Sequence, residues 1–394
     1  MRISAVTPLP VTFPTEREPM AFCFVRIDTD EGISGYGETC DSYGCSYAGV
    51  IAATISDAFA PLLVGEQAGP VEITAERLRA WTRRRLGDHG VACQARSAVE
   101  IALWDLQGRS SGRSVSDILG RVRGAVAVYA SCGFLDEGPA PWHADRLAPL
   151  LDRGVRMAKV RVGPDWATDL ATLRVLRSLL DDAVELMVDG SEIFTLPTAL
   201  RVADQLAELG VAWFEEPLPQ CERAGIEELA RRSPVPIAYG EHLFGFDDAL
   251  DSLRRGQLSV LQPDASTCGG IAEARRIAQA ASSFGARVVP HVCAGPVSLA
   301  ANLHVAASVP AIRAIEYPPS LLGAWEAFGT GAPLGLDAVV DGALTVPDGP
   351  GLGVGLDEAC VRDHPYRVPR HLAGVRAADA PTRVGFPDRF TGDR

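Results

Sequence analysis

Three apolar runs in the middle of the chain each end in a carboxylate. The runs cover residues 185–189, 211–215 and 236–241, and their last residues follow one another at intervals of 26. A strand, a helix and two short loops take about this length in a parallel β/α unit. The pattern therefore predicts three adjacent parallel strands whose carboxyl ends bring three acids to one edge of a sheet.

The same alternation continues on both sides of these runs. Further apolar runs cover residues 125–131, 156–163, 260–264, 286–291 and 311–317. Amphipathic or helical stretches follow seven of the eight runs, among them 166–180, 195–209, 226–232, 271–283 and 296–308. Eight such units within about 200 residues predict a closed α/β barrel with polar residues at its C-terminal mouth. An open, doubly wound sheet is the alternative, but no Gly-rich phosphate loop follows any of the runs.

The first 120 residues have a different pattern. We expect strands at 1–9, 22–28 and 33–38 and helices at 48–60 and 95–108, which make an α+β domain of residues 1–120 ahead of a barrel of residues 121–340. The remainder, 341–394, is rich in Gly, Pro, Asp and Arg. We expect it to pack back on the first domain, with a short strand at 367–368 and a loosely held end from 377.

Length and composition limit the function. A chain of 394 residues is too long for one compact core, which agrees with two domains. The absence of an apolar stretch of about 18 residues argues against a membrane span, and the start of the chain does not resemble a secretory signal. A net charge of −13 argues against nucleic acid as a partner. Nine cysteines without paired metal-ligand spacing indicate reduced thiols and a cytoplasmic location.

The acids that end the three central runs are Asp189, Glu215 and Glu241. Oxygen ligands that converge from neighbouring strand ends suit a hard divalent cation, Mg²⁺ before Zn²⁺. The alternative is that these acids cap the helices that follow them, which explains one or two acids better than three at equal spacing. The sequence therefore predicts a Mg²⁺ site formed by these three side chains.

An aspartate and a histidine end two neighbouring runs downstream. Asp264 ends one run, and His291 ends the next run 27 residues later. Adjacent strand ends of a barrel lie close enough for an Asp–His hydrogen bond, which fixes the imidazole tautomer and raises its basicity. A lone histidine at a strand end is more often a structural hydrogen-bonding group, but the aspartate and the facing acids favour a catalytic dyad.

Two cations alternate with apolar residues in an upstream run. Lys159 and Arg161 therefore point to the same side of their strand, which is the barrel interior near the mouth. There they face the acids and any anionic substrate; the alternative is an internal ion pair with a metal-site acid. A divalent cation, a histidine base and two cations suit removal of a proton α to a carboxylate, because they stabilise the resulting enediolate.

Several motifs carry a family resemblance over nearly the whole chain. They are Gly35-Tyr-Gly-Glu38, the segment 102–108, Lys159-Val-Arg161, Val188-Asp189-Gly, Phe214-Glu215-Glu216-Pro217, Gly240-Glu241, Gln262-Pro263-Asp264, Gly269-Gly270, His291 and Glu316-Tyr317. In this order and spacing they resemble the enolase superfamily, in the mandelate-racemase-like branch of its mandelate racemase/muconate lactonizing enzyme group.

The resemblance implies a TIM-like (β/α)7β barrel with an N-terminal α+β capping domain whose loops set specificity. By position these loops are 14–20 and 40–47, with Arg17, Tyr43 and His242 as substrate contacts. Glu316 matches the family's acid that hydrogen-bonds the enediolate oxygen. The resemblance also implies a small-molecule carboxylate substrate and assembly into dimers or octamers.

Two positions depart from the family pattern. The family's Asp-Ala-Asn is here Asp189-Gly190-Ser191, and the second Lys of its Lys-x-Lys strand is Arg161. In family racemases that Lys is the base on the face opposite the His, and arginine is a poor base because its pKa exceeds about 12.

A one-base reaction follows from this departure: His291 removes the α-proton and then protonates a departing β-hydroxyl. The sequence thus predicts a Mg²⁺-dependent hydro-lyase that converts an aldonic or aldaric acid to a 2-keto-3-deoxy acid. A racemase or epimerase of an α-hydroxy acid, and a catalytically silent metal- or ligand-binding protein, remain as alternatives.

Overall fold

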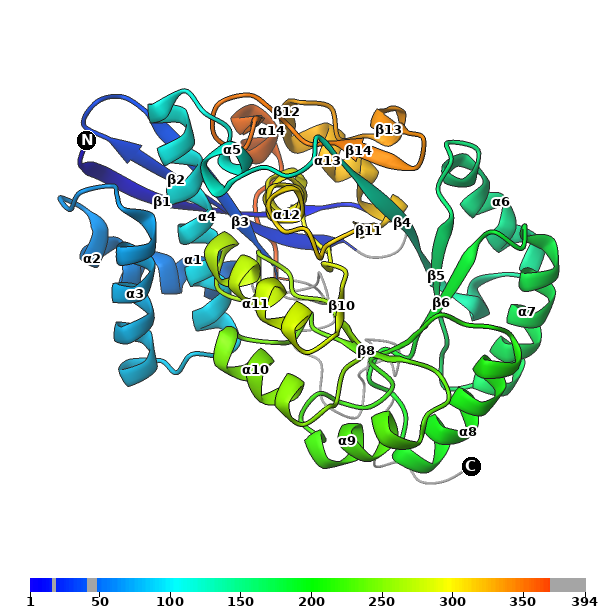
Figure 1. Ribbon diagram of the computed structural model, residues 1–394. Helices are drawn as coiled ribbons and strands as arrows, with labels where there is room; N and C mark the ends of the chain where they lie inside the picture. The colour runs from blue at the N-terminus through cyan, green and yellow to red at the C-terminus, as the bar shows by residue number, and fades with distance from the viewer. Residues whose placement is uncertain (16–18, 41–47, 369–394) are drawn as a thin grey trace.

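Eight parallel strands form a barrel at the centre of the molecule (Figure 1). The computed structural model describes residues 1–15, 19–40 and 48–368. The strands are β4 (Ala125–Phe134), β5 (Met157–Arg161), β6 (Glu185–Asp189), β7 (Phe214–Glu215), β8 (Ile237–Tyr239), β9 (Val260–Leu261), β10 (Arg287–Val288) and β11 (Ala314–Tyr317). Each pairs with the next from β4 to β10, β11 pairs with β4, and a bridge from Val288 to Ile312 completes the circuit. The predicted α/β barrel is confirmed.

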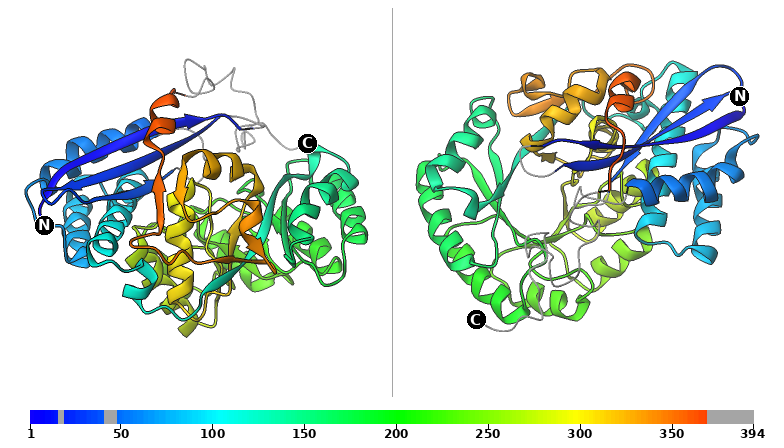
Figure 2. Two further views of the ribbon diagram at one scale, coloured as in Figure 1. Left: turned by 90° about the horizontal axis from the view of Figure 1, so that it is seen from above. Right: turned by 180° about the vertical axis from the view of Figure 1, so that it is seen from behind.

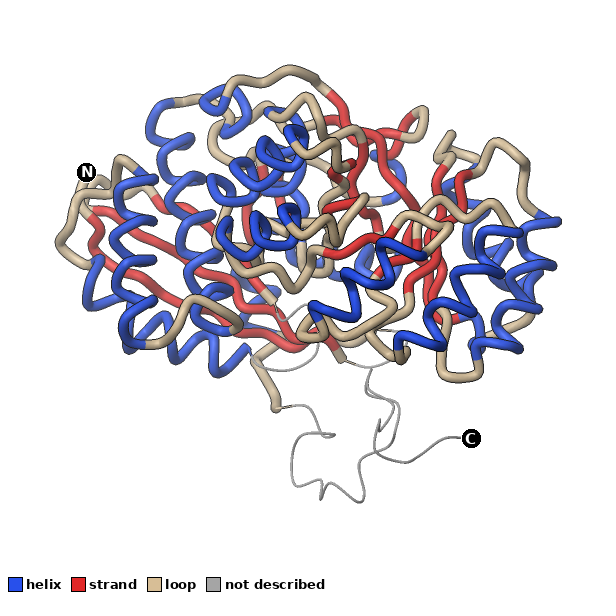
Figure 3. The backbone as a smooth tube through the Cα atoms, turned by 60° about the horizontal axis from the view of Figure 1, so that its bottom comes forward, coloured by secondary structure: helices blue, strands red, loops and turns tan. Residues whose placement is uncertain are grey.

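Helices cover the outside of the barrel (Figures 1 and 3). They are α6 (Ala140–Leu151), α7 (Trp166–Leu179), α8 (Leu196–Glu208), α9 (Arg223–Arg232), α10 (Phe246–Arg254), α11 (Ile271–Ser283) and α12 (Pro296–Ser308). The strands therefore have one core on their outer face and another inside the barrel, as β6 illustrates. Leu186 and Val188 belong to the core beneath the helices. Met187, between them, packs inside the barrel with Trp213 and Tyr129. Within the described ranges, no helix is long and apolar enough to cross a membrane.

The N-terminal domain packs an antiparallel sheet against helices on one side of the barrel. The sheet contains β1 (Ile3–Phe13), β2 (Met20–Thr29) and β3 (Ser34–Thr39). The helices are α1 (Ala48–Thr54), a π-helical turn (Ile55–Phe59), α2 (Ala60–Leu63), α3 (Val71–Arg85), α4 (Val91–Ser111) and α5 (Val115–Leu119). A Cβ on Gly37 would lie 1.8 Å from the carbonyl oxygen of Ala98, so β3 approaches α4 closely only because this position is glycine.

The C-terminal segment first extends the barrel sheet and then returns to the N-terminal domain. The strands β13 (Val339–Val340) and β14 (Ala343–Thr345) form a hairpin, and β14 pairs with β4. Residue 340 thus lies within this hairpin. After α13 (Leu322–Phe328), the strand β12 (Gly329–Gly331) pairs with β15 (Val354–Leu356).

The last described helix, α14 (Glu358–Asp363), is drawn in orange-red in Figure 2 and lies against the blue N-terminal strands. There Arg26 donates to Glu358 at 2.8 Å. The strand expected at 367–368 is not present; instead, the backbone N–H of Arg367 donates to the Thr12 hydroxyl at 2.9 Å.

Two carboxylates of the N-terminal domain cap barrel helices. Glu38 at the end of β3 accepts backbone hydrogen bonds from Gly295 at 2.5 Å and Ser298 at 2.9 Å, at the start of α12. Glu100 of α4 accepts from the first two N–H groups of α11, at 2.7 and 2.9 Å. Charged acceptors at helix N-termini satisfy unpaired donors and complement the helix dipole. The N-terminal domain thus fixes the two helices that follow β9 and β10.

A buried histidine joins the same regions. His304 of α12 accepts a hydrogen bond from the backbone N–H of Ser116 at 3.0 Å, and its Nε2 lies 3.0 Å from the carbonyl of Leu352. This arrangement requires a neutral ring with its proton on Nε2. Burial lowers the pKa of His304 to about 4. The side chain is a structural group outside the barrel mouth.

Candidate active site

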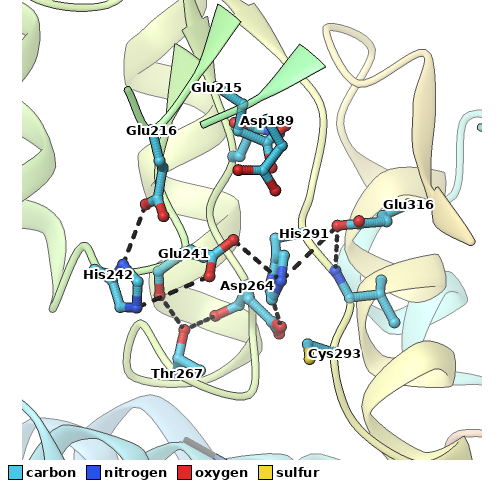
Figure 4. A network of polar contacts seen from close by, with 12 residues as sticks. Asp189, Glu215, Glu216, Glu241, His242, Asp264, Thr267, His291, Cys293 and Glu316 are labelled. Carbon is cyan, nitrogen blue, oxygen red and sulfur yellow. Dashed lines mark hydrogen bonds and ion pairs between the residues drawn. The ribbon is translucent and has the colours of Figure 1, made fainter. Parts of the chain in front are cut away.

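Asp264 and His291 meet at the C-terminal end of the barrel (Figure 4). Asp264 Oδ2 lies 3.1 Å from His291 Nδ1. The other oxygen, Oδ1, accepts from the backbone N–H and the hydroxyl of Ser266, both at 2.7 Å, and from Asn302 Nδ2 at 2.9 Å. Three donors thus orient the carboxylate so that Oδ2 faces the imidazole. Since a carboxylate only accepts, the proton of a neutral His291 sits on Nδ1, and Nε2 is the basic nitrogen.

His291 Nε2 faces two further carboxylates. It lies 3.3 Å from Glu241 Oε2 and 3.9 Å from Glu316 Oε2. Burial disfavours the charged ring, but Glu241 and Glu316 raise the pKa of His291 well above its usual value. The ring therefore binds a proton firmly beside these two acids. Positive charge beside the acids would reverse this effect, so that more of the ring is neutral near pH 7 and able to accept a proton.

The predicted ligands Asp189 and Glu215 are register partners on β6 and β7. Asp189 Oδ1 accepts from the backbone N–H of Ser191 at 2.7 Å. Glu215 Oε1 contacts Lys159, while Oε2 accepts from Trp213 Nε1 at 3.1 Å and from Gln262 Nε2 at 2.7 Å. Asp189 is therefore held by the segment that follows its own strand, and Glu215 is held by donors that include Lys159 of β5 and Gln262 after β9.

Burial raises the pKa values of two of the acids in the site, whereas the pKa of a third is lowered by nearby cations. It raises the pKa of Glu215 to about 7, although Lys159 opposes the rise, and it raises the pKa of Glu241 to about 8, with repulsion from Glu216 adding to the effect. Burial also disfavours the charged form of Glu316, but attraction to Lys159 and His291 lowers its pKa to about 2. At Glu316 the attraction to Lys159 and His291 thus outweighs burial, whereas at Glu241 the attraction to His291 and His242 does not.

Lys159 and Arg161 point into this site from β5, as the alternation predicted. Lys159 Nζ contacts Glu215, lies 3.0 Å from Glu316 and 3.6 Å from Asp189, and its side chain is 0% exposed. Arg161 Nε lies 3.3 Å from Asp189, and its side chain is 29% exposed. The ion pairs given as the alternative are therefore present for both. Arg161 is the cation that a solute in the mouth can reach.

A second group of ligand-type side chains lies beside the predicted one. Among the described residues, Glu192, Glu216 and His242 place ligand atoms within 4.8 Å of one another, and none of the three predicted ligands belongs to this group. His242 Nδ1 lies 3.1 Å from Glu216 Oε1, and its Nε2 lies 3.8 Å from Glu241 Oε1 (Figure 4). Glu192 and Glu216 both have positive φ, 60° and 38°, an uncommon backbone conformation that directs their side chains here.

The donors fit a divalent cation. Asp189, Glu215 and Glu241 offer carboxylate oxygens, which hard cations such as Mg²⁺ prefer, and burial keeps these oxygens from bulk water. Burial, with a smaller effect of repulsion between the acids, raises the pKa of Glu215 and Glu241, and a bound dication would favour their ionised forms. Of the residues expected to contact substrate, His242 lies in the site, while Arg17 and Tyr43 lie outside the described residues.

Several side chains of the site were not predicted from the sequence. Asn302 and Ser266 orient Asp264, and Ser131 of β4 hydrogen-bonds Glu316. Asn302 carries a signal that could have identified it, because it is a polar residue in the fully buried helix α12. Glu192 and Ser131 carry no comparable local signal.

Comparisons with known proteins agree with this architecture. Residues 2–120 match the model "Mandelate racemase / muconate lactonizing enzyme, N-terminal domain", and residues 143–360 match "Enolase C-terminal domain-like". The chain is 30% identical to the D-galactarolactone cycloisomerase of Agrobacterium fabrum over 89% of this chain and 92% of the relative. It is 31% identical to the arabinonate dehydratase of Saccharolobus solfataricus over 74% of this chain and 78% of the relative.

A solved structure of a racemase from Streptomyces coelicolor with bound magnesium is also similar. It has a TM-score of 0.82 and 28% identity, and the match covers 92% of this chain and all of that chain. Bound magnesium in this relative supports a divalent metal in the family. The chain therefore belongs to the mandelate racemase/muconate lactonizing enzyme group of the enolase superfamily, among relatives of the acid-sugar dehydratase type.

Proposed function

We propose that this protein is a Mg²⁺-dependent dehydratase of an aldonic or aldaric acid. The observation that carries the proposal is the fixed orientation of His291, whose Nε2 faces the acids of the mouth while Asp264 holds Nδ1 at 3.1 Å. Asp189, Glu215 and Glu241 would hold the ion. When bound, it supplies positive charge that stabilises the enediolate form of the substrate carboxylate.

The chain's own residues would divide the reaction as follows. His291 Nε2 accepts the α-proton, and Asp264 stabilises the resulting imidazolium. Lys159 and Arg161 add positive charge beside the carboxylate. Glu316 would hydrogen-bond its oxygen only after taking up a proton, because an ionised carboxylate only accepts. The electron pair of the broken C–H bond first moves onto the substrate carboxylate, which gives the enediolate. The pair then returns to form a C=C bond between the α- and β-carbons as the C–O bond to the β-hydroxyl breaks. The imidazolium returns its proton to that oxygen, water leaves, and the enol tautomerises to the 2-keto-3-deoxy acid.

Arg161 favours this one-base reaction over racemisation. Attraction to Asp189 outweighs burial and raises the pKa of Arg161 above its already high value, so this side chain does not accept a proton. A racemase needs an effective base on both faces of the α-carbon. Names of relatives, including an arabinonate dehydratase and an L-talarate/galactarate dehydratase, support the same chemistry.

A second candidate differs only in the leaving group. Relatives named D-galactarolactone cycloisomerase and 3,6-anhydro-alpha-L-galactonate cycloisomerase are 30% and 33% identical to the chain. With a ring oxygen in place of the β-hydroxyl, the same dyad would open the ring of a cyclic sugar-acid derivative. Release of water distinguishes the two reactions, since ring opening yields an isomer.

The test is a screen of purified protein with Mg²⁺ and a panel of aldonic, aldaric and cyclic sugar acids, with 2-keto-acid formation and product mass as readouts. His291→Asn should abolish any turnover found, and the matched variant of the exposed His89, His89→Asn, should keep it. Turnover that survives His291→Asn would contradict the proposed base. If no acid on the panel reacts, α-proton exchange in D₂O separates a racemase or epimerase from a silent binding protein.

Two quantities complete the proposal. We expect one Mg²⁺ per subunit and a homo-oligomer, dimeric or octameric. Elemental analysis of the dialysed protein measures the first, and light scattering after size-exclusion chromatography measures the second. A metal content near zero after loading would contradict the Mg²⁺ site.

A further inference from the structure

Two cysteines meet where the N-terminal domain contacts the barrel mouth. Cys40 follows directly after β3, and its Sγ donates to the carbonyl oxygen of Cys293 at 3.1 Å. Cys293 comes two residues after His291 and lies beside the dyad (Figure 4). Both residues are thiols and not disulfides in this structure. Residues 253 positions apart in the sequence thus meet in one contact, between the Cys40 thiol and the backbone of Cys293.

The neighbouring residues of β3 brace the same region. Glu38 accepts from the start of α12, and the Thr39 hydroxyl donates to the Ser266 carbonyl at 2.5 Å. Three consecutive residues, 38–40, therefore contact the segments that follow Asp264 and His291. A covalent change at Cys40 or Cys293 alters a contact that supports both members of the dyad.

Cys293 differs chemically from the buried cysteines of the core. The neighbouring Cys40 thiol lowers the pKa of Cys293 to about 6, although burial acts in the opposite direction, and His291 and Arg161 add to the lowering. Burial instead raises the pKa of the Cys23, Cys93 and Cys268 thiols. Cys293 is also partly exposed, whereas those three are buried. A thiolate that small oxidants can reach is the reactive form of cysteine.

We propose that Cys293 and Cys40 form an oxidation site at which hydrogen peroxide produces a disulfide between the N-terminal domain and the barrel. The Cys293 thiolate attacks one peroxide oxygen, the O–O bond breaks, and a sulfenic acid and hydroxide form. The Cys40 sulfur then attacks the Cys293 sulfur, the S–O bond breaks, and the Cys40 proton leaves with the hydroxyl as water. Overall, two thiols lose two electrons, and one peroxide is reduced to two waters.

The disulfide should stop turnover. Disulfide geometry requires an S–S bond of about 2.05 Å and a Cβ–Cβ distance of about 3.8 Å, so it replaces the present thiol contact with a shorter, directed one. The backbone two residues from His291 must adjust to it. A thiol reductant such as dithiothreitol reverses the bond and restores the original contact.

The first experiment does not depend on knowing the substrate. The full-length protein with Mg²⁺ is treated with hydrogen peroxide, remaining thiols are alkylated, and unreduced peptides are analysed by mass spectrometry. We expect a peptide pair joined through Cys40 and Cys293, and loss of the Cys293 thiol about tenfold faster than loss of the exposed Cys221 thiol. A Cys293 that stays reduced while Cys221 is oxidised, or that joins a different cysteine, overturns the proposal.

Variants separate the two steps. In Cys40→Ser, dimedone should trap a sulfenic acid at Cys293 and no joined pair should form; in Cys293→Ser, Cys40 should stay alkylatable. The control Cys221→Ser should give the same joined pair as the unaltered protein. Once a substrate is known, peroxide should inactivate the unaltered protein reversibly. Full turnover by protein that carries the disulfide would refute the claim that the disulfide stops turnover, but not the claim that it forms. Failure of the proposed dehydratase activity leaves the peptide result unaffected.

Discussion

Replacing Asp264 by asparagine should remove most of the activity without disturbing the fold. The reason lies in the donors around Oδ1: the Ser266 N–H, the Ser266 hydroxyl and the Asn302 amide. An NH₂ group in that position would face donors, so the asparagine must keep its oxygen there. Its NH₂ group then faces His291 Nδ1, which becomes an acceptor. The imidazole proton moves to Nε2, the nitrogen that the proposed mechanism uses as the base.

The size of the effect follows from this tautomer change. General base catalysis contributes about 10²–10⁴-fold, and loss of the correct tautomer in a comparable Asp–His pair costs about 10⁴-fold. We therefore expect kcat to fall by about 10²–10⁴, which corresponds to about 3–5 kcal/mol of transition-state stabilisation. KM should change little, because Asp264 is 0% exposed and touches no solute.

The assay combines kinetics with NMR. Steady-state rates on the identified substrate measure kcat and KM, and ¹H–¹⁵N spectra of ¹⁵N-histidine protein report which ring nitrogen carries the proton. Far-UV circular dichroism confirms the fold. A variant within tenfold of the original kcat, with its proton on Nε2, would refute the reasoning, because His291 would then not act as the base.

Three further predictions concern charge and metal. Lys159→Met leaves buried carboxylates without their cation and should lower the free energy of unfolding, measured by urea titration, by about 3–5 kcal/mol. Arg161 is partly exposed, so Arg161→Met should lower it by only about 1 kcal/mol. Equal losses in the two variants would contradict the assigned contacts. The pKa of His304 is about 4 in the folded state and about 6.5 in the unfolded state, so the free energy of unfolding that depends on its neutral ring is fully present above pH 6.5 and is lost as the pH falls to 4. Between these pH values, the free energy of unfolding of His304→Gln should therefore fall by about 3 kcal/mol less than that of the unaltered protein. The same pH dependence in both proteins would argue against a neutral buried ring. EDTA should stop turnover and lower the melting temperature, and Mg²⁺ should restore both; unchanged melting would mean that the folded state binds no metal more tightly than the unfolded state.

The sequence by itself determined the architecture of the barrel. The spacing of apolar residues that distinguishes strands from helices can be read from short stretches of the chain. For this reason the expected helices at 271–283 and 296–308 agree with α11 and α12. The parallel order then follows from regular spacing, because each crossover returns the chain to the same edge of the sheet. For the same reason, acids at the ends of consecutive strands could be assigned to one mouth before any contact was known.

The tertiary structure decided which atoms of those residues meet. The orientation of Asp264 depends on Asn302, 38 residues away, and the contact between Cys40 and Cys293 spans 253 residues. The caps that Glu38 and Glu100 provide span 257 and 171 residues. No local period encodes such pairs, because their partners are distant in the chain and meet only when the barrel closes or when the two domains pack. The sequence thus identified the groups that carry the chemistry. Packing within the barrel determined the tautomer of His291 and the charges around it, and packing of the N-terminal domain on the barrel determined the contact between Cys40 and Cys293.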